Sequence, residues 1–84
     1  MRIRDKALRE LAERFCEEMT ITSRARYVAT LARRYGASTW RFDSEQEAMP
    51  GHYEGTPRQY LWQAFKSGAT MPISERRLRS LLTA

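Results

Sequence analysis

The stretch GTPRQYLWQAF, residues Gly55–Phe65, combines the signals of a helix start with a row of large side chains. Thr56 is of a type that caps helices, and Pro57 suits the first helical position because the amide it lacks would find no partner there. Gly68 is expected to end the helix, since glycine readily adopts the left-handed conformation common after a last turn. The residues expected to face inward are Leu61, Ala64 and Phe65. A helix this short needs other elements against which to bury that face.

Apolar spacings of three and four predict a further helix near the N-terminus. Its apolar residues are Ile3, Ala7, Leu8, Leu11, Ala12, Phe15 and Met19. Opposite charges stand four residues apart on its other side, as in Asp5 with Arg9 and Lys6 with Glu10, and each such pair adds a few tenths of a kcal/mol. We therefore expect one face of this helix in the core and the other in solvent.

Two more helices are predicted, one in the middle of the chain and one at its end. The middle helix is opened by Thr22 or Ser23 and ended by Gly36, and the last helix is capped by Ser74. The apolar stripe of the middle helix consists of Tyr27, Val28, Leu31, Ala32 and Tyr35, and that of the last helix consists of Leu78, Leu81 and Leu82.

The pattern weakens between Ala37 and Glu54. STWRF alternates like a short strand, SEQEAM fits one helical turn capped through Ser44 and Glu47, and the PG pair breaks whatever precedes it. An irregular insert and a small β-hairpin both remain open. The fold class is therefore mainly α: a single domain, residues 1–84, built as a compact bundle of about four helices with this insert.

Charge is unevenly distributed along the chain. The net charge is +5 and the isoelectric point about 10.0, which favours an anionic partner. No acidic residue occurs from Ile21 to Arg41, whereas this stretch holds Arg24, Arg26, Arg33, Arg34 and Arg41. In nucleic-acid-binding proteins, such arginine clusters bind the phosphate groups of the backbone.

Cysteine content and hydropathy indicate the cellular setting. The single cysteine, Cys16, excludes an internal disulfide and favours a reducing, cytoplasmic location. No apolar run approaches the roughly 18 residues that cross a bilayer, so no membrane partner is expected. His52 is the only histidine and Cys16 has none nearby, so we expect neither an enzyme nor a metal or other cofactor.

The segment GTPRQYLWQAFKSGATMPISERRLRSLL, Gly55–Leu82, resembles the recognition helix and the following helix of phage-repressor-like (Cro-like) helix-turn-helix proteins. The segment LARRYGAS, Leu31–Ser38, resembles the first helix and turn of the same superfamily, so residues 37–54 are expected to be an insertion between the two halves. The resemblance covers about a third of the chain with its longer segment. It implies binding to double-stranded DNA, with the start of the recognition helix at base edges.

Residue by residue, the resemblance and the charge pattern give two sets of site residues. The expected base contacts are Arg58, Gln59, Trp62 and Gln63. The expected phosphate contacts are Arg24, Arg26, Arg33, Arg34, Tyr60 and Lys66. Arginine pairs bidentately with guanine and glutamine with adenine, which suits the first set. We expect both sets on one surface, with Trp62 exposed.

The function predicted from these features is that of a small basic DNA-binding transcriptional regulator of phage or plasmid type. A homodimer is expected because one short recognition helix gives limited affinity and operators are often two-fold. Two alternatives remain: a small inhibitor or adaptor that docks on an acidic or nucleic-acid-binding partner protein, and an RNA-binding domain on which bases stack at Trp62. If the aromatic residues of the Pro57 helix only form a core face, the base-reading assignment fails.

Overall fold

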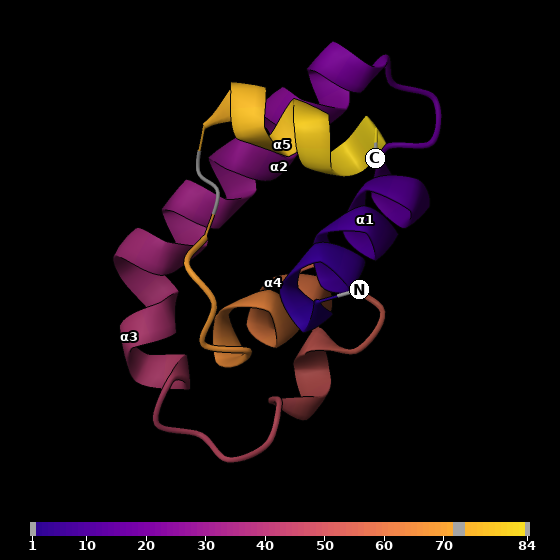
Figure 1. Ribbon diagram of the computed structural model, residues 1–84. Coiled ribbons are helices and arrows are strands. Elements are labelled where there is room, and N and C mark those ends of the chain that lie inside the picture. Colours follow the sequence, from indigo (N-terminus) through magenta and orange to yellow (C-terminus); the bar gives the residue numbers. More distant parts are fainter. Residues whose placement is uncertain (1, 72–73, 84) are drawn as a thin grey trace.

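The computed structural model describes residues 2–71 and 74–83, and these are helical throughout apart from their connections (Figure 1). The helices are α1 (Ile3–Phe15), α2 (Ile21–Arg34), α3 (Trp40–Asp43), α4 (Pro57–Lys66) and α5 (Glu75–Thr83), with a π-helical turn at Tyr35–Thr39 and a 3-10 turn at Gly51–Tyr53. The prediction of a mainly α bundle with four principal helices is confirmed. The alternative of a β-hairpin insert is wrong, because the described residues contain no strand.

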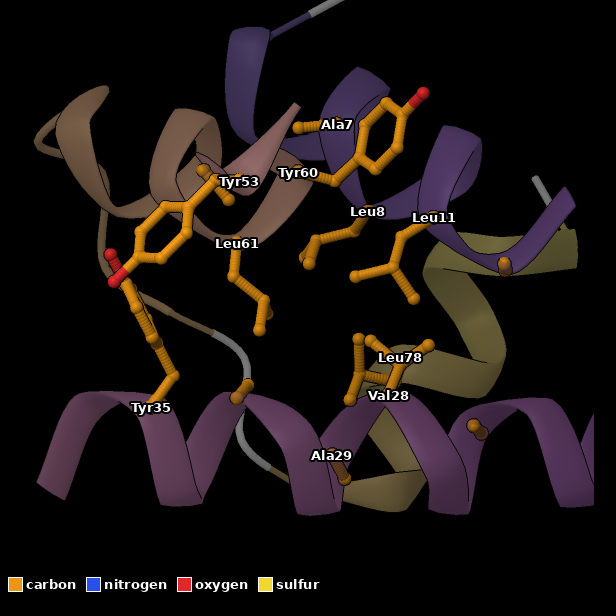
Figure 2. Close-up of a cluster of buried hydrophobic side chains, with 14 residues drawn as sticks. Ala7, Leu8, Leu11, Val28, Ala29, Tyr35, Tyr53, Tyr60, Leu61 and Leu78 are labelled. Carbon is orange, nitrogen blue, oxygen red and sulfur yellow. The ribbon is translucent and has the colours of Figure 1, made fainter. Parts of the chain in front are cut away.

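The helices pack as two pairs, α1 against α4 and α2 against α5, around one core. Each of the four contributes fully buried aliphatic side chains, and these point toward one another in Figure 2. The central ones are Leu8, Leu11, Val28, Leu61 and Leu78. Burying a side chain of this size contributes about 1.5–3 kcal/mol, so these contacts are the main cohesion of the bundle.

The ends of the predicted helices are confirmed in two places and corrected in others. Gly68 follows α4 with a φ of 80°, and the Ser74 hydroxyl accepts from the Arg77 amide, as expected for a helix end and a cap. Met19 lies beyond the end of α1 and is 38% exposed, and Ile3 is 67% exposed, so the apolar face of α1 is shorter than predicted. No described helix is both long enough and apolar enough to cross a membrane.

The start of α2 differs from the prediction. Its cap is Thr20 rather than Thr22 or Ser23: the Thr20 hydroxyl accepts from the Ser23 amide at 3.2 Å. Threonine and serine can both accept from a free helix amide. The presence of Thr20, Thr22 and Ser23 within four positions therefore does not reveal which one caps the helix.

Gly36 does not end the middle helix. The chain continues from α2 through the π turn into α3, so residues 21–43 form one rod. Gly36 is needed for another reason: a Cβ atom there would lie 3.1 Å from the ring of Phe65 on α4. The glycine therefore marks a close approach between α4 and the rod.

The connection from Ser44 to Thr56 is irregular apart from its 3-10 turn. STWRF is helical rather than extended, and SEQEAM forms turns and bends rather than a capped helical turn. The chain before α4 is thus neither the preceding helix that the resemblance requires nor the short turn of three or four residues found in helix-turn-helix units.

Candidate nucleic-acid interface

The π turn sets the register of the rod. The Tyr35 hydroxyl donates to Oδ2 of Asp43 at 2.8 Å, although the two residues are eight positions apart. In a regular α-helix, seven positions bring residues back to the same face, and a π turn takes up one additional residue. Residues eight apart across this turn therefore share a face.

The same offset aligns arginines on the solvent side. Arg33 and Arg41 are eight residues apart across the π turn, and Arg26 precedes Arg33 by seven within α2. All three are exposed, as is Arg34 beside them. We call Arg26, Arg33, Arg34 and Arg41 the arginine face. At 1.5 Å per residue it extends for about 20 Å along the rod.

Few negative charges oppose the arginine face. Arg26 forms an ion pair with Glu75 of α5, Nε to Oε1, at 3.5 Å, and both side chains are largely exposed. Within the described chain, the guanidinium groups of Arg33, Arg34 and Arg41 form no ion pair. The only acid of the rod, Asp43, is 9% exposed and directed inward. The face therefore presents uncompensated positive charge to solvent.

An aromatic side chain lies at one end of the arginine face. Phe42 is 62% exposed, and the Arg41 guanidinium carbon lies 4.9 Å from its ring centroid. The sequence pattern does not single out Phe42, because STWRF alternates like a short strand and its structure stays open at that level. Exposure of a large aromatic ring beside a cation is a feature of binding surfaces.

Arg24 has a structural role in the free protein. Its Nε donates to the Met19 carbonyl at 3.1 Å and its Nη2 to the Glu17 carbonyl at 2.8 Å, which ties α2 to the turn after α1. Burial raises the pKa of the neighbouring Cys16 thiol, with Arg24 opposing the shift. Cys16 is 1% exposed and so is a core residue, and Arg24 lies apart from the arginine face.

Arg58, the first predicted base reader, is exposed at the start of α4. Its Nη1 donates to the Tyr53 hydroxyl at 3.4 Å, and its guanidinium lies over the Tyr53 ring. Tyr53 in turn donates to Oδ2 of Asp43 at 2.7 Å, and the hydroxyl ends of Tyr35 and Tyr53 converge in Figure 2. Arg58 therefore lies beside the inward-facing Asp43, whereas the arginine face lies on the solvent side of the rod.

Gln59, the second predicted base reader, is engaged at the start of α4. Its Oε1 accepts from the Gly55 amide at 2.8 Å, and the residue is half-buried. The expected cap, Thr56, instead donates its hydroxyl to the Tyr53 carbonyl at 2.6 Å. The side chain that stabilises this helix start is thus Gln59, at the third helical position. It resembles the N3 residue of a capping box but accepts from the residue before the cap.

The aromatic residues of α4 are less exposed than predicted. Tyr60 is 3% exposed and packs edge-on against Phe15 with ring centroids 6.2 Å apart. Trp62 is half-buried, and its indole Nε1 is enclosed without a hydrogen-bond partner. The expectation of an exposed Trp62 is wrong, because its side chain packs against the core cluster.

The last two site residues on α4 also contact the protein itself. Gln63 is half-buried and lines a shallow groove with Ile3 and Lys6 of α1. Lys66 donates from Nζ to the carbonyls of Gln46 at 2.9 Å and Ser44 at 3.3 Å, just beyond the end of α3. A cation at that place satisfies carbonyls of a helix end.

Comparison of the chain with known proteins finds no matching family model and no match among curated proteins or solved structures. Of the ten predicted site residues, the structure brings Arg26, Arg33 and Arg34 together and adds Arg41, which the sequence pattern placed in the same acid-free stretch. The predicted base readers lie on another helix, α4, and Arg58 among them is linked through the Tyr53 hydroxyl to Asp43 at the end of the rod.

Proposed function

We propose that this protein binds double-stranded DNA, with the arginine face making phosphate contacts. The observation that carries the proposal is the unbroken rod from Ile21 to Asp43, which presents three unpaired, exposed guanidinium groups in a row on a rigid element. Duplex DNA carries about one negative charge per 1.7 Å of its axis, so the three unpaired arginines, which span about 12 Å, can meet several phosphates at once, and Arg26 extends the row to about 20 Å.

In this proposal, phosphate contacts supply most of the affinity and Arg58 supplies base selectivity. Arg58 is the exposed member of the predicted base readers, and its guanidinium can still pair with a guanine edge. Gln59, Trp62 and Gln63 then support the helix rather than read bases. The finer role of a small transcriptional regulator of phage or plasmid type rests on this selectivity.

The experiment is a fluorescence-anisotropy titration of a short random-sequence duplex between about 50 and 200 mM salt. We expect a dissociation constant of about 1–100 μM at the lower salt, and a slope of log affinity against log salt near −3, because each phosphate contact contributes about −0.9. Arg33→Gln with Arg41→Gln should reduce the slope by about two units.

The matched control is Arg2→Gln with Lys6→Gln, which removes the same charge from exposed positions near the N-terminus. We expect it to leave the slope within about half a unit of wild type. Absence of duplex binding at low salt, or equal effects of the two double variants, would contradict the proposal, since net charge alone would then explain the affinity.

A second candidate function, docking on an acidic protein surface, is favoured by Phe42. Aromatic and arginine side chains together are enriched at protein interfaces, and Phe42 with Arg41 provides such a pair. If the protein ignores random duplex but binds an acidic peptide, and Phe42→Ser abolishes that binding, this function replaces DNA binding.

A further inference from the structure

A cleft lies between α1 and α5, lined by residues other than those of the arginine face. Its volume is about 700 Å³, and much of this space is open to solvent. α5 packs against both α2 and α1, and its ribbon lies near that of α1 in Figure 1. The cleft is therefore lined by residues from the two ends of the sequence. The charged and polar residues that line it include Arg4, Asp5, Arg9, Arg76, Arg77 and Ser80.

Positive charge in the cleft exceeds negative charge. Four guanidinium groups line it, and Asp5 is the only carboxylate among its described lining residues. Asp5 is already engaged by Arg4, whose Nε donates to Oδ1 at 2.8 Å. Among the residues that the structure describes, Arg9, Arg76 and Arg77 form no ion pair.

Two of the four arginines are held in place by backbone carbonyls. Arg4 donates from Nη1 to the Thr70 carbonyl at 2.6 Å, and Arg9 donates from Nε to the Leu81 carbonyl at 3.1 Å. Each of these side chains is only partly exposed and keeps further N–H groups for other acceptors. Side chains that are already ordered lose less entropy when a ligand binds.

The other two arginines lie where positive charge is unfavourable. Arg76 and Arg77 are in the first turn of α5, at the positive end of the helix dipole. Glu75 in the same turn pairs with Arg26 of α2 instead. An anion in the cleft would offset both the repulsion among the guanidinium groups and their repulsion from the helix end.

We propose that this cleft binds a small ligand with two or more linked phosphate groups, of the nucleoside diphosphate or triphosphate class. Guanidinium groups pair bidentately with phosphate oxygens, and several converging arginines match several phosphates. The volume exceeds what one orthophosphate fills and leaves room for a nucleoside. The inference is independent of DNA binding, because it uses a different set of arginines.

The test is calorimetric titration of the full chain with ATP, pyrophosphate and orthophosphate at matched ionic strength, with thermal unfolding alongside. We expect one ATP or pyrophosphate per chain and a rise in Tm of about 4 °C or more at saturating ligand, because the ligand binds only the folded state. Arg76→Gln with Arg77→Gln should weaken binding at least about tenfold. ATP binding tighter than pyrophosphate would add a nucleoside contact to the site.

Two further variants separate a built site from general charge attraction. Arg33→Gln with Arg34→Gln removes the same charge from the arginine face and should leave the affinity unchanged within about twofold. Ser80→Phe fills the cleft without changing charge and should weaken binding as strongly as the Arg76 and Arg77 changes, while duplex binding stays as in wild type. If the double variant at 76 and 77 fails to fold by circular dichroism, Arg9→Gln takes its place.

Three results would overturn the inference. The first is no binding of ATP or pyrophosphate at low salt. The second is orthophosphate binding as tightly as pyrophosphate, since the site would then not recognise linked phosphates. The third is an equal loss of affinity in the cleft variant and the arginine-face variant, which would reduce the effect to net charge.

Discussion

The hydroxyl of Tyr35 and the carboxylate of Asp43 meet at 2.8 Å across eight residues of one continuous rod. Tyr53 donates to the same Oδ2 from the 3-10 turn before α4, at 2.7 Å. A single buried carboxylate oxygen therefore fixes the π turn, the end of α3 and the approach to α4. Together with the buried stripe of α2, this network holds one side of the rod against the core and leaves the arginine face on the solvent side.

Removing the carboxylate should destabilise the protein strongly. We expect Asp43→Ala to lower the free energy of unfolding by about 2–4 kcal/mol, because two buried hydroxyls lose a charged acceptor. Urea denaturation monitored by circular dichroism measures the change. Glu47→Ala, at an exposed position of the following loop, is the control and should stay within about 0.5 kcal/mol of wild type. An equally small effect of Asp43→Ala would show that the network contributes little.

Alkaline pH should weaken the fold through the same network. Burial, and then the hydrogen bond to Asp43, raise the pKa of both Tyr35 and Tyr53 above the ordinary value of about 10. The unfolded chain therefore loses these protons before the folded chain does, so the stabilisation is complete below about pH 10 and declines as pH rises further. Each tyrosine contributes up to about 1.4 kcal/mol per pH unit in that range.

Denaturation curves collected from neutral pH to above pH 10 test this sign. Tyr35→Phe should flatten the alkaline decline, whereas Tyr27→Phe, which lies on the same helix without a hydrogen bond to Asp43, should leave it unchanged. A decline that is equally steep in Tyr35→Phe and wild type would assign the alkaline sensitivity to other groups.

The sequence was sufficient to predict α1, α4 and α5. In each, apolar residues recur at helical spacing over two or more turns, and Thr56, Pro57, Gly68 and Ser74 mark the ends. The rod was not predictable beyond Arg34, because its π turn shifts the apolar period by one residue and Gly36 imitates a helix end. STWRF alternates in sequence like a strand, in which Trp40 and Phe42 would share a face. In the helical rod the two residues lie on different sides, so Trp40 packs inward and Phe42 faces solvent.

The candidate site was predictable only in part. An acid-free stretch with several arginines indicated a cationic surface, but not that Arg24 would contact backbone carbonyls or that Arg41 would align with Arg33. The resemblance implies a surface position for Tyr60, and the inward face of Leu61, Ala64 and Phe65 implies one for Trp62, but Tyr60 is buried and Trp62 is half-buried. The width of a buried arc depends on how closely α1 packs, and that distance is a tertiary property.

Gly36 provides a test of close packing. A glycine-to-alanine change inside a helix usually stabilises by about 0.5–1 kcal/mol. Here the new methyl would lie 3.1 Å from the Phe65 ring, which is itself held between Tyr35 and Trp40 at centroid distances of 5.3 and 5.4 Å. We therefore expect Gly36→Ala to lower the free energy of unfolding by about 1 kcal/mol, as measured by urea denaturation.

Two comparisons make the Gly36 result interpretable. Gly51→Ala introduces a methyl with no neighbour within 4 Å and should be close to neutral. Phe65→Leu removes the ring that the methyl meets, so Gly36→Ala should cost less in that background, and the difference is the coupling between the two sites. A stabilising Gly36→Ala in the wild-type background would mean that the ring shifts without loss.

The separate roles proposed for Arg58, as a base contact, and for the arginine face, as a set of phosphate contacts, can be measured directly. We expect Arg58→Ala to reduce the preference for a selected duplex over a random one by about 1–3 kcal/mol at one base pair, because a bidentate base contact is lost. We expect Arg33→Ala to weaken both duplexes alike and to lower the salt slope by about one unit, because only a phosphate contact is lost.

Anisotropy titrations of both variants against both duplexes distinguish these outcomes. Arg58→Lys is the control for charge, since it keeps a cation beside Tyr53 but cannot form the bidentate pair. If the lysine variant retains the preference, charge rather than base pairing accounts for it. If Arg58→Ala weakens both duplexes equally, Arg58 reads no base, and the selectivity required of a transcriptional regulator must come from some other part of the molecule.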